Sequence, residues 1–203
     1  QVFAGYKADS DNAQAWIEES WFNTGDLGYM DEQGFLYLTG RAKDLIIRGG
    51  HNIDPELIEE PLNLHPDVIT ATAVGMPDPY AGELPMAFVV VRPGSTVTAQ
   101  TLLAYCEENV SERAAVPKRI EIIDAMPMTA VGKIFRPALR QQISAAILQE
   151  HLEREHINAM VETRFDNKKG MTATVVLQDA ARQEETRSLL SPYNIDITVS
   201  IEN

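Results

Sequence analysis

The segment MPMTAVGKIFR, Met126 to Arg136, contains a lysine that could take part in phosphate chemistry. Lys133 follows a glycine, and no acidic residue lies nearer to it in the sequence than Asp124. A glycine–lysine pair is part of the phosphate-binding P-loop, which also needs a glycine five positions before the GK glycine and a Ser or Thr directly after the lysine. Those positions hold Pro127 and Ile134, so this is not a P-loop. Lys133 is either a solvated charge or a cation held for a partner supplied from elsewhere.

Two other polar residues could contact a sugar or a phosphate. Asp26 lies in TGD, where an ionised carboxylate can accept two hydrogen bonds from a cis-diol such as ribose, or can simply organise the turn after Gly25. Arg41 lies in TGR at an expected strand end, where its guanidinium fork suits a surface ion pair or a sugar-phosphate contact. Lys43 precedes Asp44 and could pair with it locally.

The charge of the chain limits the classes of partner. A net charge of −13 argues against a nucleic-acid backbone, because such binding uses Lys and Arg to neutralise phosphates. Residues 113–140 are an exception, since they hold a local excess of basic residues over Glu121 and Asp124: Arg113, Lys118, Arg119, Lys133, Arg136 and Arg140. This stretch is either a solvated face or a landing surface for a small phosphate-bearing ligand.

Composition places the 203 residues among ordinary globular chains, with enough length for one large domain or two small ones. No apolar run approaches the roughly 18–20 residues that span a bilayer, and no amino-terminal signal pattern is present. The single cysteine, Cys106, excludes an internal disulfide and follows an amphipathic pattern, so we expect a buried thiol and a cytoplasmic protein. We expect the histidines to be loop, cap or helix-flank residues, and therefore no structural metal.

Hydrophobic periodicity and turn residues predict the elements that position these residues. Residues 21–41 read as strand, turn, strand, with Asp31 and Gly34 in the turn. Asp54 and Pro55 start a helix that Pro61 should kink or shorten, and Thr98 caps another. Further strands are expected at 43–50, 67–77, 83–94 and 118–124, a long helix from Pro137, and a β-β-α-β tail from about residue 157.

Taken in order, several segments resemble the carboxyl-terminal portion of the adenylate-forming acyl-CoA synthetases. They are WFNTGDLGYMDEQGFLYLTGRAKDLIIRGGHNIDPELIE, HPDV, GELPMAFVV and the series Pro127, Thr129, Gly132, Lys133, Ile134. The superfamily includes firefly luciferase and the adenylation domains of nonribosomal peptide synthetases. GRAKDLIIRGGHNIDPELIE is more similar to acyl-CoA synthetases than to peptide-synthetase domains, which tend toward a glutamine-containing DxQVKIRG run. The resemblance covers about residues 1–142.

The resemblance implies an α+β fold in three parts. Residues 1–42 would end the large AMP-binding domain, and residues 43–142 would form the small mobile domain, with a β-hairpin and a three-stranded sheet flanked by helices. Residues 143–203 would add a helix and the β-β-α-β appendage. The Gly/Ser/Thr-rich phosphate loop and the acyl pocket of the family are absent from these 203 residues. We therefore expect a fragment with little or no activity by itself.

The implied reaction joins a carboxylic acid to ATP, giving acyl-adenylate and pyrophosphate, and then forms a thioester with CoA. ATP would arrive with Mg²⁺, bound mainly by the absent domain, and the expected setting is fatty acid metabolism. One alternative passes the acyl group to a carrier-protein phosphopantetheine, and another is a non-catalytic interaction or regulatory module. The tail would pad the protein or form a homodimer, or else act as a ligand-sensing or docking module.

The resemblance also assigns roles at the nucleotide. Asp26 is similar to the family aspartate that binds the ribose hydroxyls of ATP and of the acyl-adenylate, and Arg41 to the arginine that assists it. Leu38 matches an apolar position near the nucleotide. Asn52 stands where some relatives carry an arginine, which puts a nucleotide contact there in doubt.

Three further positions are linked by the resemblance to the two half-reactions. Lys43 falls at the hinge about which the small domain turns. Gly49 and Gly50 match the loop that lines the pantetheine tunnel in the thioester-forming state. Lys133 matches the lysine that reaches the substrate carboxylate and the α-phosphate during adenylation.

Overall fold

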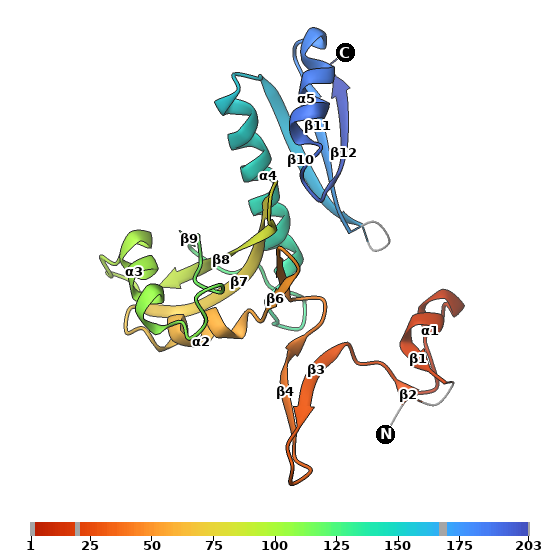
Figure 1. Ribbon diagram of the computed structural model, residues 1–203, viewed down its shortest axis with the longest axis vertical. Coiled ribbons are helices and arrows are strands. Elements are labelled where there is room, and N and C mark those ends of the chain that lie inside the picture. Colours follow the sequence, from red (N-terminus) through yellow and green to blue (C-terminus); the bar gives the residue numbers. More distant parts are fainter. Residues whose placement is uncertain (1–2, 19–20, 167–169, 203) are drawn as a thin grey trace. The chain divides into compact units, whose positions relative to one another are not determined.

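The computed structural model describes residues 3–18, 21–166 and 170–202, and the chain divides into two compact units, residues 1–44 and 45–203 (Figure 1). The first unit contains α1 (Asp9–Ala15), β1 (Trp16–Ile17), β2 (Trp21–Phe22), β3 (Asp26–Met30) and β4 (Leu36–Arg41). Strands β3 and β4 are antiparallel. Their turn is closed by the Asp31 carboxylate, which accepts hydrogen bonds from the N–H groups of Gln33 and Phe35, both at 2.9 Å. The predicted strand, turn and strand are confirmed.

The second unit is built on a five-stranded sheet. Its strands are β5 (Ile46–Arg48), β6 (His51–Ile53), β7 (Val68–Asp78), β8 (Gly82–Val91) and β9 (Arg119–Ile122). The order is β6-β5-β8-β7, and β9 pairs in parallel with β8 on the edge opposite β7. The β5–β6 hairpin joins β8 through one residue pair, Arg48 with Gly82. The expected hairpin and three-stranded sheet are therefore parts of one sheet, of which β7 is an outer edge.

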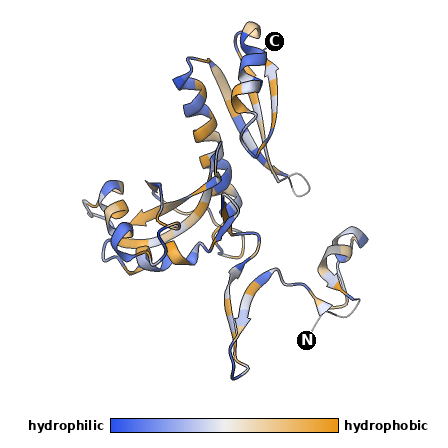
Figure 2. Ribbon diagram, in the orientation of Figure 1, coloured by the Kyte–Doolittle hydropathy of each residue, from blue (hydrophilic) through white to orange (hydrophobic). Residues whose placement is uncertain are grey.

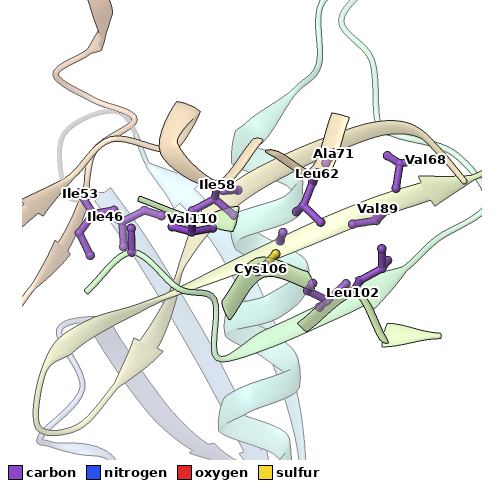
Figure 3. Packing of buried hydrophobic residues seen from close by; sticks show 14 residues of the cluster. Ile46, Ile53, Ile58, Leu62, Val68, Ala71, Val89, Leu102, Cys106 and Val110 are labelled. Carbon is purple, nitrogen blue, oxygen red and sulfur yellow. The ribbon is translucent and has the colours of Figure 1, made fainter. Parts of the chain in front are cut away.

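Helices cover both faces of this sheet, because successive side chains of a strand point to opposite faces. Ala87 and Val89 belong to a core formed with α2 (Glu56–Leu64) and α3 (Ala99–Asn109), part of which Figure 3 shows. Met86 and Phe88, the alternating residues of β8, belong to a second core beneath α4 (Arg136–Arg154). Hydrophilic and hydrophobic segments alternate along α4, as its amphipathic sequence requires (Figure 2).

The starts of the two helices that cover the first face follow the expected chemistry. The Asp54 carboxylate accepts the Glu56 N–H at 3.0 Å, and the Thr98 hydroxyl accepts the Thr101 N–H at 3.1 Å. Pro61 does not end α2, which continues to Leu64. An interior proline removes one hydrogen bond and its ring crowds the carbonyl four residues earlier. Ile58 and Leu62, on either side of it, are fully buried in the core, which offsets this cost.

The tail forms the expected β-β-α-β arrangement on α4. Its elements are β10 (Ala159–Asp166), β11 (Gly170–Leu177), the short 3₁₀ helix η1 (Ala180–Arg182), α5 (Gln183–Leu190) and β12 (Asp196–Ile201). Strand β11 is antiparallel to β10 and parallel to β12. Leu148 and Leu152 of α4 are fully buried in the tail core, and Leu139 and Ile143 in the core beneath α4, so α4 belongs to two of the three cores of this unit. The fold class is α+β, as expected.

The helices in the described part of the chain include none that is long and apolar enough to cross a membrane.

Burial of Cys106 gives a test of the first core. Its side chain is fully buried, and burial raises the pKa of the thiol from 9.0 to about 11. At pH 8 the thiolate fraction is then about 100-fold smaller than that of a thiol with the ordinary pKa, and the thiolate is the reactive form. We expect Cys106 to react with an aromatic disulfide reagent at least about 100-fold more slowly in the folded chain than in denaturant.

The matched control is Val131→Cys, because Val131 is 79% exposed. Its added thiol should react in the folded chain at the rate of a free cysteine. Equal rates for Cys106 in the folded and denatured chains would contradict this core.

Candidate functional site

Asp26 and Arg41, fifteen residues apart, are cross-strand neighbours in the β3–β4 hairpin. Arg41 Nε lies 3.1 Å from Asp26 Oδ1, with the arginine side chain 63% exposed and the aspartate side chain 29% exposed. The carboxylate therefore retains acceptor capacity toward solvent, since an ionised carboxylate offers about four lone-pair sites. The hairpin joins an acceptor and a donor in one exposed polar pair.

A β-bulge brings Leu38 onto the face of this pair. Gly28 pairs with Leu38 and Leu27 with Gly40, so the register shifts by one residue between them. Without the shift, positions 38 and 41 would point to opposite faces; with it, Leu38 faces the same way as Arg41. Gly28 is required here, because a Cβ atom at this position would lie 2.5 Å from the Tyr37 carbonyl oxygen. Leu38 is 68% exposed, so the face offers an apolar contact beside a polar pair.

Lys43 lies in the connection between the two units. The Asp44 N–H donates to the Arg41 carbonyl at 3.0 Å, which makes residues 41–44 a turn, and the first unit ends at Asp44. The Lys43 side chain is exposed.

Gly49 and Gly50 are the two-residue loop of the β5–β6 hairpin. Their φ angles are +57° and +84°, the left-handed values that such tight hairpin turns need and that glycine adopts without strain. The Gly49 N–H donates to the Ala81 carbonyl at 2.7 Å, and the Glu83 carboxylate accepts the Ile47 N–H at 2.9 Å. The exposed glycine loop is thereby fixed to the β7–β8 hairpin.

Lys133 lies near the end of a short hairpin that runs directly into α4. The Thr129 N–H donates to the Lys133 carbonyl at 2.7 Å, and the Lys133 N–H donates to the Thr129 hydroxyl at 3.0 Å. Gly132 closes the turn with a φ of +75°. The Lys133 side chain is exposed, and within the described residues it forms no ion pair. The backbone is held firmly while the ammonium group stays available.

Ion pairs divide the basic stretch of residues 113–140 into two groups. Arg119 pairs with Glu121 and Glu150, Arg136 with Glu59, and Arg140 with Glu83. The other three, Arg113, Lys118 and Lys133, form no ion pair in the part of the chain that the structure describes. Each of these three arginines therefore pairs with a glutamate from a distant segment, which sequence neighbours could not reveal.

Two histidines form pair contacts, and neither lies in a cluster of acidic side chains among the described residues. His151 Nδ1 lies 2.8 Å from the Tyr193 hydroxyl, and burial lowers the pKa of the imidazole. His51 pairs with Glu112 alone. In residues 3–18, 21–166 and 170–202, no three His, Cys, Asp or Glu side chains form a group that could hold a metal ion.

One contact near Lys133 was missed from the sequence. The ion pair of Arg136 with Glu59 joins α2 to the start of α4, and neither residue is a candidate site residue by sequence. The sequence gives only a weak signal for this pairing, because the two residues are 77 positions apart.

Residues 57–133 match the AMP-binding enzyme C-terminal domain family. The chain is 51% identical over 152 residues to the marinolic acid–CoA ligase of Pseudoalteromonas sp. (strain SANK 73390), an alignment that covers 75% of this chain and 23% of the relative. It is 44% identical to the oxalate–CoA ligase of Arabidopsis thaliana, covering 69% of this chain and 27% of that protein.

Solved structures show the same fold. ATP-bound MatB from Rhodopseudomonas palustris matches with a TM-score of 0.65 and 30% identity, over 71% of this chain and 29% of that one. The o-succinylbenzoate CoA synthetase of Bacillus subtilis, in complex with its acyl-adenylate intermediate, matches with a TM-score of 0.60 and 36% identity, over 66% and 27%.

The chain spans only about a quarter of the length of the curated relatives it matches, 23% to 29% for those most similar. What it shares with them is their carboxyl-terminal portion, with the Lys133 hairpin at the end of the matched domain. Residues 57–133 match the AMP-binding enzyme C-terminal domain family, and the chain resembles part of the adenylate-forming CoA ligases.

Proposed function

We propose that the complete protein containing this chain is an AMP-forming acyl-CoA ligase. It would convert a carboxylic acid and ATP to an acyl-adenylate and pyrophosphate, and then transfer the acyl group to CoA. The observation that carries the proposal is Lys133: an exposed ammonium group on an anchored hairpin, at the end of a domain of the AMP-binding enzyme family. The relatives are CoA ligases by name, which supports CoA as the acceptor.

In this proposal the β3–β4 hairpin contacts the nucleotide. Asp26 accepts hydrogen bonds from the ribose hydroxyls, and Arg41, paired with it at 3.1 Å, orients the carboxylate. Leu38 supplies an apolar contact on the same face. The support is the shared face that the β-bulge creates.

Lys133 would act in the adenylation step. That step brings a carboxylate and a polyphosphate together and expels pyrophosphate, so negative charge crowds in the transition state. A cation placed there in advance stabilises the developing charge, and groups of this kind are typically worth on the order of 3–4 kcal/mol. An acidic partner would weaken this role, and none lies against the lysine in the described residues.

Lys43 and the two glycines would serve the change between half-reactions. A rotation about the 41–44 turn would withdraw Lys133 and present the Gly49–Gly50 loop to the pantetheine arm of CoA. Movements of loops and small domains commonly complete and then reopen an active site in this way. The exposed turn at the end of the first unit is consistent with such a hinge.

The proposal extends to several features of the whole protein. ATP would be used with Mg²⁺, held mainly by residues outside this chain. The setting would be fatty acid metabolism in the cytoplasm. A homodimer formed through the tail stays a prediction, as do the domain limits at residues 42 and 142.

The direct test measures AMP release by the complete protein with ATP and a panel of fatty and aromatic acids. We expect AMP to appear with an acid and CoA together, with stoichiometric thioester. A purified carrier protein bearing phosphopantetheine replaces CoA in a parallel reaction. Product with the carrier alone would favour carrier loading, and no AMP under either condition would exclude the ligase.

Lys133→Ala should separate the two half-reactions. We expect acid-dependent exchange of pyrophosphate into ATP to fall by on the order of 10²–10³-fold, because a preorganised charge is lost from the adenylation transition state. Thioester formation from supplied acyl-adenylate should stay within about twofold. Lys118→Ala is the matched control, since Lys118 is also exposed and without an ion pair in the described residues. Equal loss of both half-reactions would contradict a role limited to adenylation.

Lys43→Pro tests the hinge. Proline fixes φ near −65° and restricts the preceding residue, so it should hold the 41–44 turn in one conformation and damage the half-reactions unequally. Lys43→Ala removes the same side chain but leaves the backbone free, and should keep both rates. Wild-type rates for both half-reactions in the proline variant would remove the hinge assignment.

A further inference from the structure

Strand β7 is an edge strand whose outward backbone groups bond to side chains instead of to another strand. The Ala71 N–H donates to Asn63 Oδ1 at 2.8 Å, and the Ala73 N–H donates to Glu59 Oε1 at 2.7 Å. The Ala73 carbonyl accepts from Arg136 Nη1 at 2.9 Å. Because Ala71 and Ala73 are buried, these backbone groups need partners inside the protein, and α2 and α4 supply them.

Glu59 and Arg136 also bind each other through two parallel contacts. Arg136 Nη1 lies 2.5 Å from Glu59 Oε1, and Nη2 lies 3.0 Å from Oε2. The arginine side chain is only 23% exposed and the glutamate side chain only 13% exposed. This forked geometry needs a guanidinium group, because a lysine ammonium is a single point charge that cannot reproduce both contacts together with the bond to Ala73.

The pair lies at the downstream end of the Lys133 hairpin. Arg136 is the first residue of α4, and the preceding Phe135 N–H donates to the Pro127 carbonyl at 2.7 Å. At the upstream end, Met126 is 8% exposed in the core beneath α4. The hairpin therefore has an apolar anchor before it and an ionic anchor after it, with Lys133 three residues from the ionic one.

We propose that Glu59 and Arg136 are positioning residues for Lys133. Their forked contact on β7 would hold the end of the hairpin, so that the ammonium group meets the reacting carboxylate and phosphate in one orientation. This inference rests on the proposed ligase function. Neither residue touches substrate; each acts through the lysine.

The first test measures the mobility of the hairpin and does not depend on activity. A nitroxide label is attached to Val131→Cys in the 203-residue chain, where the native Cys106 is buried and its raised pKa makes it unreactive. Arg136→Lys and Glu59→Gln should each narrow the paramagnetic resonance lines of the label. The matched control is Glu150→Gln, which alters another arginine–glutamate contact to α4, away from the hairpin. In that contact Arg119 Nη1 lies 2.8 and 3.0 Å from the two Glu150 carboxylate oxygens. Unchanged resonance lines in both test variants would contradict the proposal that Glu59 and Arg136 hold the end of the hairpin.

The second test uses the half-reactions of the complete protein. We expect Arg136→Lys and Glu59→Gln to lower acid-dependent pyrophosphate exchange by about tenfold or more, since small misplacements of a reacting group cost up to roughly 10²-fold. Thioester formation from supplied acyl-adenylate should stay within about twofold, and Glu150→Gln should leave both steps near wild type. Unchanged exchange, or equal loss of both half-reactions, would overturn the positioning role.

The two failures are distinguishable. If the wild-type protein shows no acid-dependent pyrophosphate exchange with any acid, the proposed ligase function fails. The resonance lines of the nitroxide label then still test whether Glu59 and Arg136 anchor the hairpin. If the wild type exchanges and Lys133→Ala abolishes that exchange while Arg136→Lys does not lower it, only the positioning role fails.

Discussion

The outward backbone groups of β7 at Ala73 are buried, and a buried N–H or carbonyl without a partner destabilises a fold by roughly 1–3 kcal/mol. Glu59 and Arg136 bond both groups and also bond each other. The contact of Glu59, Ala73 and Arg136 therefore joins α2, β7 and α4. The two helices lie on opposite faces of the sheet, and β7 lies at its edge. The position of α2, the start of α4 and the direction from which the Lys133 hairpin leaves the domain all depend on it.

The same contact is one of three that pair basic residues of the 113–140 stretch in a strongly acidic chain. With a net charge of −13, the chain supplies Arg119, Arg136 and Arg140 with glutamates brought from other elements. Lys133 differs because hydrogen bonds to Thr129 orient its backbone and leave its side chain in solvent. These arginines join elements of the fold, whereas the lysine side chain stays exposed, as its proposed role toward an anionic substrate requires.

Local patterns predicted most elements, but contacts between distant residues could not be read from them. Segments rich in Val, Ile, Thr and Phe and bounded by Gly and Pro predict β7 and β8, and Thr98 predicts the start of α3, because these signals lie within a few residues. The bulge opposite Gly28, which turns Leu38 toward the face of Arg41, depends on register and leaves no local mark. Glu59 and Arg136 meet across 77 residues, and Pro61 is tolerated because tertiary burial outweighs one lost hydrogen bond. Helix α1 and the β1–β2 pair had no clear periodicity and were not predicted.

The tail adds a consequence for any rotation about the 41–44 turn. Helix α4 begins at Arg136, beside the Lys133 hairpin, and its later residues Leu148 and Leu152 are fully buried in the tail core. Residues 45–203 accordingly form one compact unit, in which the domain and the tail share a helix. In the proposed hinge motion, a rotation that withdraws Lys133 would therefore carry the tail with it. A molecule bound to the tail, which lies outside the matched residues 57–133, would then act on the same rotating body.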